Sequence, residues 1–425
     1  IGLIGLGNIG TKVAEELLQN NKFNQKFNLK VVLVRNLTKY KNIAFRNNKL
    51  KINNHNLGFK LVDNPEKLFE DKDIDVIIEL MGGVDPAFEY VKRSPTAGKH
   101  VITANKELIS KEINELLNIS CKHNSKIRFE AAVGAGIPII EILLKLGRQN
   151  EIHSIRGIIN GTSNYILSNM SENGSNFGDV LKEAQDLGFA ESDPTNDIDG
   201  LDAKFKIAIL GTLAFKSEIS PKSVYVEGIR KISNKDFKYA KELGFNIKLL
   251  AFAEKEGSTI SARVHPVLIP INYPMSKVDK NYNVIEIDGD LIGKLWMQGE
   301  GAGSCSTASA IFGDLMSLVD SSGSEIRSLN QNLKIITIDK NVNKNYLRLL
   351  VVDQPGVLAQ IAGIFSNNKI SIASVIQKDL DPDKQLVDLV IMTHESIEKN
   401  IQDVIKKISL LKVVKQHPLL IRVED

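Results

Sequence analysis

A glycine-rich loop within the first ten residues constrains the fold of this chain more than any other feature. Residues 4–10 read IGLGNIG, which fits the pattern G-x-G-x-x-G. In such a loop the first glycine permits a tight turn, the second lets a pyrophosphate approach the backbone, and the third lets a helix pack closely on a strand. The expected cofactor contacts of the loop are Gly5, Gly7, Asn8, Ile9 and Gly10.

The context of the loop supports this interpretation. It ends a strand-like segment, 1–7, and opens a helical pattern that runs from Asn8 to about Asn20. A helix N-terminus offers backbone N–H groups and the positive end of the helix dipole to phosphates. The loop therefore predicts a bound dinucleotide. The alternative is a strand–helix turn that merely needs small residues.

Strand-like and helical segments alternate after the loop. The strand-like segments are 29–34, 76–80, 100–103 and 127–130, and helical patterns cover 65–72 and 106–119. This alternation predicts a parallel sheet wound with crossover helices, and short apolar strands suit a sheet that is buried on both faces. We expect an α/β fold in which residues 1–147 form a Rossmann-type doubly wound domain.

The pattern changes after residue 147. Strand-like segments at 152–159, 259–267 and 284–290 alternate with long helical stretches, which predicts an α+β domain over 148–298. The segment 299–320 is expected to return to the N-terminal domain, and the polar stretch 321–345 is expected to be a linker. Residues 346–425 follow the order β-α-β-β-α-β, which predicts a small ferredoxin-like unit.

Composition and charge exclude several classes of protein. A formal net charge of +3 over 425 residues does not suit a dedicated nucleic-acid binder, which would show a concentrated basic face. No apolar run reaches 18 residues, so no transmembrane helix is expected, and no signal-peptide pattern is recognised. The two cysteines, Cys121 and Cys305, cannot form a disulfide scaffold and favour a reducing compartment. We expect a cytoplasmic protein without nucleic-acid or membrane partners.

The second strand-like segment ends at Arg35. A site for NAD usually carries Asp or Glu there, which binds the ribose 2′-hydroxyl, whereas an arginine can pair with a 2′-phosphate. Arg35 therefore favours NADP over NAD, although NAD stays an alternative. The competing explanation is a solvated charge cluster that includes the nearby Lys39.

The most unusual local sequence lies between residues 183 and 206. It carries seven carboxylates, at positions 183, 186, 191, 193, 197, 199 and 202, and it ends in a helical pattern with Asp202 and Lys206 four residues apart. Residues at this spacing share a helix face. A solvated acidic loop followed by an ordinary ion pair would explain the pattern, but the helix around Lys206 is strongly apolar. Such a helix should keep few charges near its core face unless they are paired or functional.

This segment resembles the signature of the homoserine dehydrogenase family: A-x-x-x-G, an aromatic residue, an acidic stretch with D-P, and then G-L-D followed by a lysine. The matching positions are Ala184, Gly188, Phe189, Asp193, Pro194, Gly200, Leu201, Asp202 and Lys206. Four further stretches resemble the same family in order: GKHVITANK at 98–106, EAAVGAGIP at 130–138, NGTSNY at 160–165, and the glycine-rich turn from 299 to 310. The departures are Ser306, where relatives often have proline, and Asp199, where some have asparagine.

The resemblance implies the reversible, nicotinamide-dependent reduction of L-aspartate 4-semialdehyde to L-homoserine, a step of threonine, methionine and isoleucine biosynthesis. It carries over Lys206 as the proton donor, Lys106 as a contact of both cofactor and substrate, and Asp202 as the partner that holds Lys206. A lysine can transfer this proton if burial or a neighbouring cation lowers its pKa. The alternative is that both lysines are ordinary surface residues.

The same resemblance assigns the remaining contacts. The substrate carries an ammonium group, which accounts for the carboxylates. The implied substrate contacts are Glu191, Asp202, Asp197 and Thr162, and Thr103, Lys106 and Gly303 complete the cofactor site. Glu130 with Val133, Ala135 and Ile137 resembles a monovalent-cation site in which backbone carbonyls bind sodium, and oxygen ligands suit such a hard cation. An apolar hinge without an ion is the alternative.

The C-terminal unit contains DQPGVL at 353–358. This sequence resembles the ACT domain, a regulatory module that usually pairs across subunits and binds amino acids at the interface. The implied ligand is L-threonine, acting as feedback inhibitor, and the implied assembly is a homodimer or homotetramer. A dimerisation unit without a ligand is the alternative, because a fold alone does not determine its ligand.

Two rival functions remain open. A dehydrogenase acting through a thiohemiacetal would need a placed nucleophilic cysteine, but Cys121 lies in a polar helical stretch and Cys305 in the late loop. A non-catalytic, NADP-sensing amino-acid regulator would bind cofactor and threonine without turnover.

Overall fold

The computed structural model describes residues 1–39, 58–320, 329, 331–381 and 385–424. Part of the expected linker 321–345 therefore lies outside the described residues. The chain forms two compact units. One comprises Ile1–Ile155, Phe205–Pro221 and Ile285–Asn332, and the other comprises Arg156–Lys204, Lys222–Val284 and Leu333–Asp425. Among the described residues, no helix has the length and hydropathy needed to cross a membrane.

The first unit contains a parallel sheet of six strands in the order β3-β2-β1-β4-β5-β6. The strands are β1 (Gly2–Ile4), β2 (Val31–Leu33), β3 (Lys60–Val62), β4 (Val76–Glu79), β5 (His100–Thr103) and β6 (Ile127–Arg128). The neighbouring strands β1 and β2 are buried along their whole length, as expected for a sheet covered on both faces. This is the doubly wound order of dinucleotide-binding domains, so the predicted fold class is confirmed.

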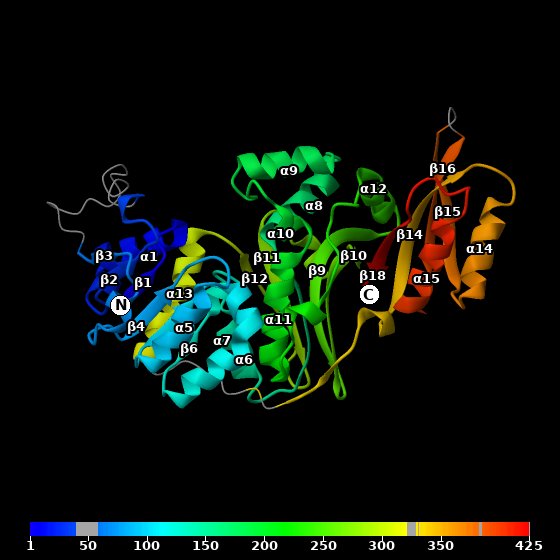
Figure 1. The fold of residues 1–425 in the computed structure, drawn as a ribbon. Helices are drawn as coiled ribbons and strands as arrows, with labels where there is room; N and C mark the ends of the chain where they lie inside the picture. The colour runs from blue at the N-terminus through cyan, green and yellow to red at the C-terminus, as the bar shows by residue number, and fades with distance from the viewer. Residues whose placement is uncertain (40–57, 321–328, 330, 382–384, 425) are drawn as a thin grey trace. The chain divides into compact units, whose positions relative to one another are not determined.

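Helices cover this sheet. They are α1 (Asn8–Gln19), α2 (Asn21–Asn24), α4 (Glu66–Phe69), α5 (Ala87–Thr96), α6 (Lys106–Lys122), α7 (Ile139–Leu146) and α13 (Ser304–Val319). Although α13 comes late in the chain, it lies beside α1 (Figure 1). Its Ile311 and Leu315 share a buried core with Val13 and Leu17, and Phe312 stacks on the ring of Phe23 with centroids 3.9 Å apart.

The chain crosses from one unit to the other within two strands and one helix, β7 (Ile152–Ile158), β11 (Tyr282–Gly289) and α11 (Leu201–Phe215), and β12 (Gly293–Glu300) belongs to the first unit. The second unit begins with α8 (Gly161–Asn173), α9 (Phe177–Asp186) and the short α10 (Thr195–Ile198). It also contains β8 (Tyr225–Val226) and α12 (Asn234–Glu242).

The sheet of the second unit runs in the order β9-β10-β18-β14-β16-β15. Its first two strands, β9 (Phe245–Glu256) and β10 (Thr259–Pro270), pair antiparallel over twelve residues. Between them lies a two-residue turn in which Gly257 has a φ of +55°, a conformation that glycine adopts without strain. The strand β13 (Lys334–Ile335) also pairs with β10.

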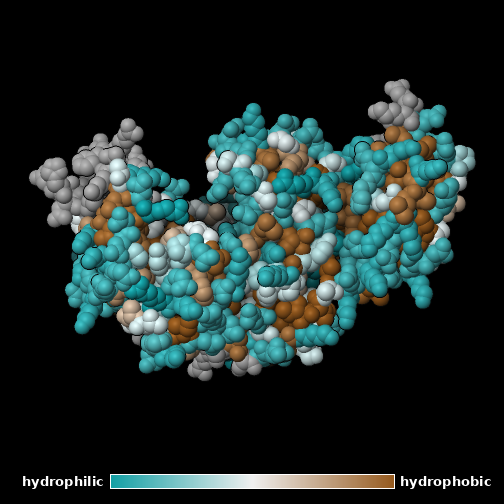
Figure 2. All heavy atoms as spheres, viewed as in Figure 1, coloured by the Kyte–Doolittle hydropathy of each residue, from teal (hydrophilic) through white to brown (hydrophobic). Residues whose placement is uncertain are grey.

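The C-terminal elements form a ferredoxin-like unit, as predicted. They are β14 (Val342–Val352), α14 (Val357–Asn367), β15 (Ile372–Asp381), β16 (Leu386–Thr393), α15 (Glu398–Ser409) and β18 (Leu419–Val423). A short strand, β17 (Ser396–Ile397), pairs with β14. The four main strands have the order β18-β14-β16-β15, and their inner faces pack on α14 and α15 around a buried core. Hydrophilic side chains cover much of the face of the molecule shown in Figure 2.

The sheet of this C-terminal part is continuous with that of the rest of the second unit. Strand β18 pairs antiparallel with β14 and parallel with β10, where Val267 lies opposite Arg422 and Leu268 opposite Val423. Backbone hydrogen bonds join β18 to both β14 and β10, so the ferredoxin-like part is attached to the rest of the second unit by the sheet as well as by the chain.

Candidate functional site

The glycine loop joins β1 to α1 at the carboxyl end of the sheet. Gly5 has a φ of +92°, its N–H donates to the carbonyl of Leu33 at 3.0 Å, and a Cβ at this position would lie 2.8 Å from the carbonyl oxygen of Leu80. A Cβ at Gly10 would lie only 2.1 Å from the carbonyl oxygen of Gly5. Both glycines are therefore required by close approach within the protein itself.

Gly7 differs from these two glycines. A Cβ at Gly7 would meet no atom within 4 Å, and Gly7 is the N-cap of α1, so Asn8 and Ile9 begin the helix. The space beside Gly7 lies where a pyrophosphate would meet the N–H groups of the helix N-terminus. The loop thus fits a dinucleotide, because Gly5 and Gly10 allow its close backbone contacts and Gly7 leaves space for the pyrophosphate beside the helix N-terminus.

The carboxyl ends of β4 and β5 carry a buried hydrogen-bond network. Glu79 is fully buried, and its carboxylate accepts from the hydroxyl of Thr103 at 2.5 Å and from the N–H of Met81 at 2.5 Å. Burial raises the pKa of Glu79 to about 7, against the lowering effect of these hydrogen bonds. Thr103 in turn accepts from the N–H of Asn105 at 2.9 Å.

Asn105 connects this network to the helix that begins with Lys106. Its side-chain oxygen accepts from the N–H of Leu108 at 3.1 Å, which caps α6, and its amide nitrogen donates to the carbonyl of Gly83 at 2.6 Å. Lys106 is half-buried at the first position of α6. Thr103 and Lys106 therefore lie at the same edge of the sheet as the glycine loop, because the carboxyl ends of parallel strands share one edge.

Three further predicted residues belong to the first unit. Arg35 is exposed just beyond β2, the strand that pairs with β1. Gly303 is the N-cap of α13 with a φ of +124°. Lys206 lies on α11 and is only 7% exposed, so this lysine is not an ordinary surface residue. Beside it, the ring of Phe205 faces the ammonium of Lys111 from α6 at 5.8 Å.

The predicted cation-binding segment lies between β6 and α7. Both carboxylate oxygens of Glu130 accept backbone N–H groups at the start of α7, from Ile140 at 2.7 Å and from Glu141 at 2.8 Å. Burial raises the pKa of Glu130 to about 7. Burial, with the charge of Glu130 next in effect, raises the pKa of the neighbouring Asp314 to about 8. The Glu130 side chain thus caps α7, and each of its oxygens keeps a lone pair beside the backbone carbonyls that are the other candidate ligands.

Those carbonyls belong to a tight turn. Ala135 has a φ of +48°, and the carbonyl of Ile137 accepts from the N–H of Ile139 at 2.8 Å. Val133 is buried beside them. Among the described residues, no group of three His, Cys, Asp or Glu side chains could hold a metal, which does not bear on a site built from carbonyls.

The acidic segment brings two of its carboxylates together in the second unit. Asp197 on α10 and Asp202 in the first turn of α11 both accept from the side-chain amide of Asn160, at 2.7 and 3.0 Å. Asp202 is 4% exposed. The hydroxyl of Thr162 donates to the carbonyl of Phe189 at 2.7 Å, two residues before Glu191. Glu191 itself lies on an exposed loop, outside the pair of carboxylates that accept from Asn160.

Sequence reasoning missed three polar residues of these sites: Glu79, Asn105 and Asn160. Asn105 and Asn160 lie within motifs that were identified, and each precedes a helix, which is a recognisable N-cap signal. Glu79 ends an apolar strand-like segment, where a lone carboxylate is a signal for a buried polar role. Their partners lie 22 to 42 residues away in the chain, so the sequence alone did not assign them.

Comparison with known proteins supports one family throughout. The model of the homoserine dehydrogenase NAD-binding domain matches residues 5–130, that of the homoserine dehydrogenase family matches 138–316, and that of the ACT domain matches 345–409. A homoserine dehydrogenase of Neisseria gonorrhoeae is 41% identical over 86% of each chain.

Solved structures give the same answer. A homoserine dehydrogenase from Thiobacillus denitrificans is 38% identical and superposes with a TM-score of 0.89 over 100% of this chain and 97% of that one. A hyperthermophilic archaeal homoserine dehydrogenase, solved in complex with NADPH, is 25% identical and has a TM-score of 0.64 over 77% of this chain and 98% of its own. On the glycine loop, the fold order and these matches, the chain belongs to the homoserine dehydrogenase family and carries a C-terminal ACT domain.

Proposed function

We propose that the chain catalyses the reversible NAD(P)-dependent interconversion of L-aspartate 4-semialdehyde and L-homoserine. The observation that carries this proposal is the pair of carboxylates joined at Asn160, because two adjacent anions can recognise the ammonium group of an amino-acid substrate. The experiment is the reduction of NADP on addition of L-homoserine. As a comparison, 4-hydroxybutyrate has the same alcohol but no ammonium group and should give at least tenfold lower kcat/KM.

In this proposal the predicted site residues transfer a proton, orient the proton donor, or bind the substrate and the cofactor. The bound nicotinamide supplies or accepts the hydride. Lys206 gives a proton to the alkoxide that develops during reduction and takes it back during oxidation. Its burial supports this role, because desolvation disfavours the charged form of a lysine and so makes proton release easier. Asp202 lies one helical turn before Lys206 and orients it, and Asp202 also binds the substrate together with Glu191, Asp197 and Thr162. Lys106 contacts both cofactor and substrate.

We propose NADP as the preferred cofactor. The support is Arg35, which is exposed beyond β2 at the carboxyl edge of the sheet, where a guanidinium can pair with a 2′-phosphate. Gly5, Gly7, Asn8, Ile9, Gly10, Thr103 and Gly303 are the remaining proposed contacts. The ratio of kcat/KM for NADP to that for NAD should fall at least tenfold in Arg35→Ala, and an unchanged ratio would reject the assignment.

We propose that L-threonine inhibits the enzyme through the ACT domain. A continuous set of contacts supports a route from this domain to the acidic segment. The guanidinium of Arg422 on β18 is fully buried and pairs with Glu398 of α15 at 2.6 Å and with Glu227 at 2.7 Å. Two residues after Glu227, the N–H of Ile229 donates to the carbonyl of Ile198 at 2.8 Å.

The end of this route reaches the proposed substrate carboxylates. The guanidinium of Arg230 pairs with both carboxylate oxygens of Asp199, at 2.5 and 3.0 Å, and Asp199 follows α10, which carries Asp197. A Cβ at Gly228 would lie 2.3 Å from the carbonyl oxygen of Ile198, so the two segments are in close contact. In this proposal a displacement of β18 is transmitted through these packed segments to Asp197.

We also propose a sodium ion bound by the carbonyls of Val133, Ala135 and Ile137 together with Glu130, bracing this turn. A carbonyl oxygen has two lone pairs, so the hydrogen bond from Ile139 to Ile137 leaves room for a cation. The thermal midpoint should be higher in sodium chloride than in the chloride of a bulky organic cation at equal ionic strength. Equal midpoints would reject the ion.

We propose that the chain assembles as a homodimer or homotetramer. The mass of the particle in solution, measured by light scattering, would test this assembly.

A further inference from the structure

Asn160 occupies the position immediately before α8. Its side-chain oxygen accepts from the N–H of Ser163 at 2.8 Å, so it is the N-cap of this helix. The residue is only 5% exposed. Taken alone, this contact would make Asn160 an ordinary helix cap, whose loss costs about 1 kcal/mol.

The side-chain amide nitrogen of Asn160 makes two further hydrogen bonds. It donates to Oδ1 of Asp197 at 2.7 Å and to Oδ2 of Asp202 at 3.0 Å. The carboxylates come from different elements, α10 and α11, which a short turn at Asp199 and Gly200 connects. Because an amide nitrogen has two N–H donors, one side chain satisfies both. The cap contact fixes the orientation of the amide, since its oxygen must face Ser163.

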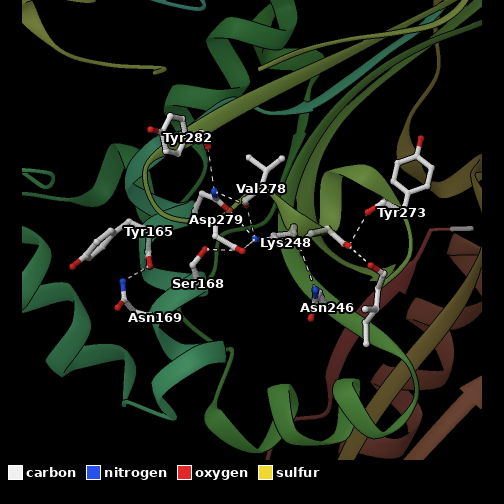
Figure 3. Close-up of polar contacts among 12 residues, drawn as sticks. Tyr165, Ser168, Asn169, Asn246, Lys248, Tyr273, Val278, Asp279 and Tyr282 are labelled. Carbon is white, nitrogen blue, oxygen red and sulfur yellow. Dashed lines mark hydrogen bonds and ion pairs between the residues drawn. The ribbon is translucent and has the colours of Figure 1, made fainter. Parts of the chain in front are cut away.

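The helix that carries Asn160 is held firmly. The amide of Asn164, one turn later, donates to the carbonyls of Val278 and Tyr282 at 2.9 and 3.1 Å. The buried ammonium of Lys248 donates to the Val278 carbonyl at 2.7 Å and to Asp279 at 2.8 Å (Figure 3). A Cβ at Gly161 would lie 2.7 Å from the carbonyl oxygen of Asn281. Asn160 therefore projects from a fixed support, as a group that must hold others in place requires.

We propose that Asn160 is a positioning residue that holds Asp197 and Asp202 side by side, ready for the ammonium group of the substrate. Two like charges repel each other, whereas N–H donors favour the charged form of a carboxylate. Without the amide, the two carboxylates would lose the donor that they share, and the substrate would no longer meet a fixed pair of partners. This role rests on the proposed function, but it assigns to Asn160 no contact with the substrate.

Two substitutions separate this role from helix capping. Serine and aspartate are both good N-caps, so Asn160→Ser and Asn160→Asp should retain α8 and unfold within a few degrees of the wild type. Serine is too short to reach both carboxylates, and aspartate replaces the donor with a third negative charge. We expect both variants to raise the KM for L-homoserine at least tenfold while the KM for NADP stays within twofold.

The pH profile gives a readout that a purely structural role would not move. In Asn160→Asp, three carboxylates hold protons more tightly, so the acidic limb of kcat/KM for L-homoserine should move to higher pH by at least half a unit. Asn20→Ser is the matched control, because the side-chain oxygen of Asn20 also caps a helix by accepting from the N–H of Lys22 at 3.0 Å. It should leave KM and pH profile unchanged.

The outcomes are distinct. Wild-type values of KM and an unmoved acidic limb in both Asn160 variants would overturn the positioning role while leaving the proposed function intact. Full recovery of kinetics in Asn160→Asp, after loss in Asn160→Ser, would show that the N–H donors of Asn160 are not needed and would also overturn the positioning role. A wild-type protein that does not oxidise L-homoserine would overturn the proposed function, and this role with it.

Discussion

The roles of some residues in this molecule can be recognised from a sequence motif, whereas the roles of others are defined only by contacts in the folded chain. The glycines of the loop were predicted from their spacing in the motif. A Cβ at Gly5 or Gly10 would lie too close to a carbonyl oxygen, whereas a Cβ at Gly7 would meet no protein atom within 4 Å. Glu79 and Asn160 act through partners that are 24 to 42 residues distant, so only a folded chain defines their roles.

Glu79 gives the clearest pH prediction at this scale. Its ordinary pKa of 4.5 is raised to about 7 in the folded protein. The folded state therefore holds a proton that the unfolded chain releases, so the contribution of Glu79 to stability is greatest below pH 4.5 and falls as the pH rises to 7. A shift of this size corresponds to about 3 kcal/mol. Glu130 and Asp314 act in the same direction.

The test is Glu79→Gln, which retains the hydrogen-bond geometry and removes the titration. The loss of unfolding free energy between pH 5 and pH 7.5 should be smaller in Glu79→Gln than in the wild type by about 2 kcal/mol. Glu89→Gln, at an exposed position of α5, is the control and should behave as the wild type. An identical pH dependence in Glu79→Gln would show that Glu79 is ionised throughout this range.

Elements were predicted well where local pattern and tertiary context agree. Most strands of the doubly wound sheet and the elements of the ferredoxin-like unit were expected close to where they lie, whereas β3 and α5 were not predicted. Strand β9 was missed because Ala, Lys and Glu are depleted in strands and its sequence, FNIKLLAFAEKE, contains all three. Its twelve paired residues with β10 outweigh that weak local preference.

The loop between β1 and α1 allows a matched pair of substitutions. Gly7→Ala places a methyl group in open space, so the thermal midpoint should change by no more than about 2 °C, while the KM for NADP should rise roughly tenfold because the pyrophosphate loses its approach to the backbone. Gly10→Ala forces its Cβ to within 2.1 Å of the Gly5 carbonyl and should lower both stability and cofactor affinity.

Gly178→Ala on α9 is the control, because a Cβ there also meets no atom within 4 Å and alanine favours a helix by up to about 1 kcal/mol. It should leave the KM for NADP unchanged. A Gly7→Ala variant with normal KM would place the cofactor elsewhere.

The molecule as a whole couples its ACT domain to the rest of the second unit by a shared sheet and by ion pairs. The presence of an ACT domain could be predicted from DQPGVL and the element order. The pairing of β18 with β10 could not, because strand partners far apart in the chain leave no local signal. That pairing places Arg422 between Glu398 and Glu227, at the start of the route to Asp199.

Removing an ion pair on this route should weaken inhibition by L-threonine and leave the oxidation of L-homoserine nearly unchanged. In Glu227→Gln, Arg422 keeps Glu398 but loses its ionised partner beside Ile229. We expect homoserine oxidation within twofold of the wild type and at least tenfold weaker inhibition by L-threonine. Glu242→Gln removes the ion pair between Glu242 and Lys378, which lies off the route, and should leave inhibition unchanged. Equal inhibition of Glu227→Gln and wild type would refute the route, and a wild type insensitive to threonine would refute the ligand.

The most direct test of the central claim is the steady-state oxidation of L-homoserine with NADP by the wild type, Lys206→Ala and Lys204→Ala. The two lysines are two residues apart on α11, and only Lys206 has the proposed catalytic role. The account predicts turnover in the wild type, a fall in kcat of at least a hundredfold in Lys206→Ala, in line with the usual contribution of a general acid or base, and nearly normal kcat in Lys204→Ala. No turnover in the wild type, or full turnover in Lys206→Ala, would contradict it.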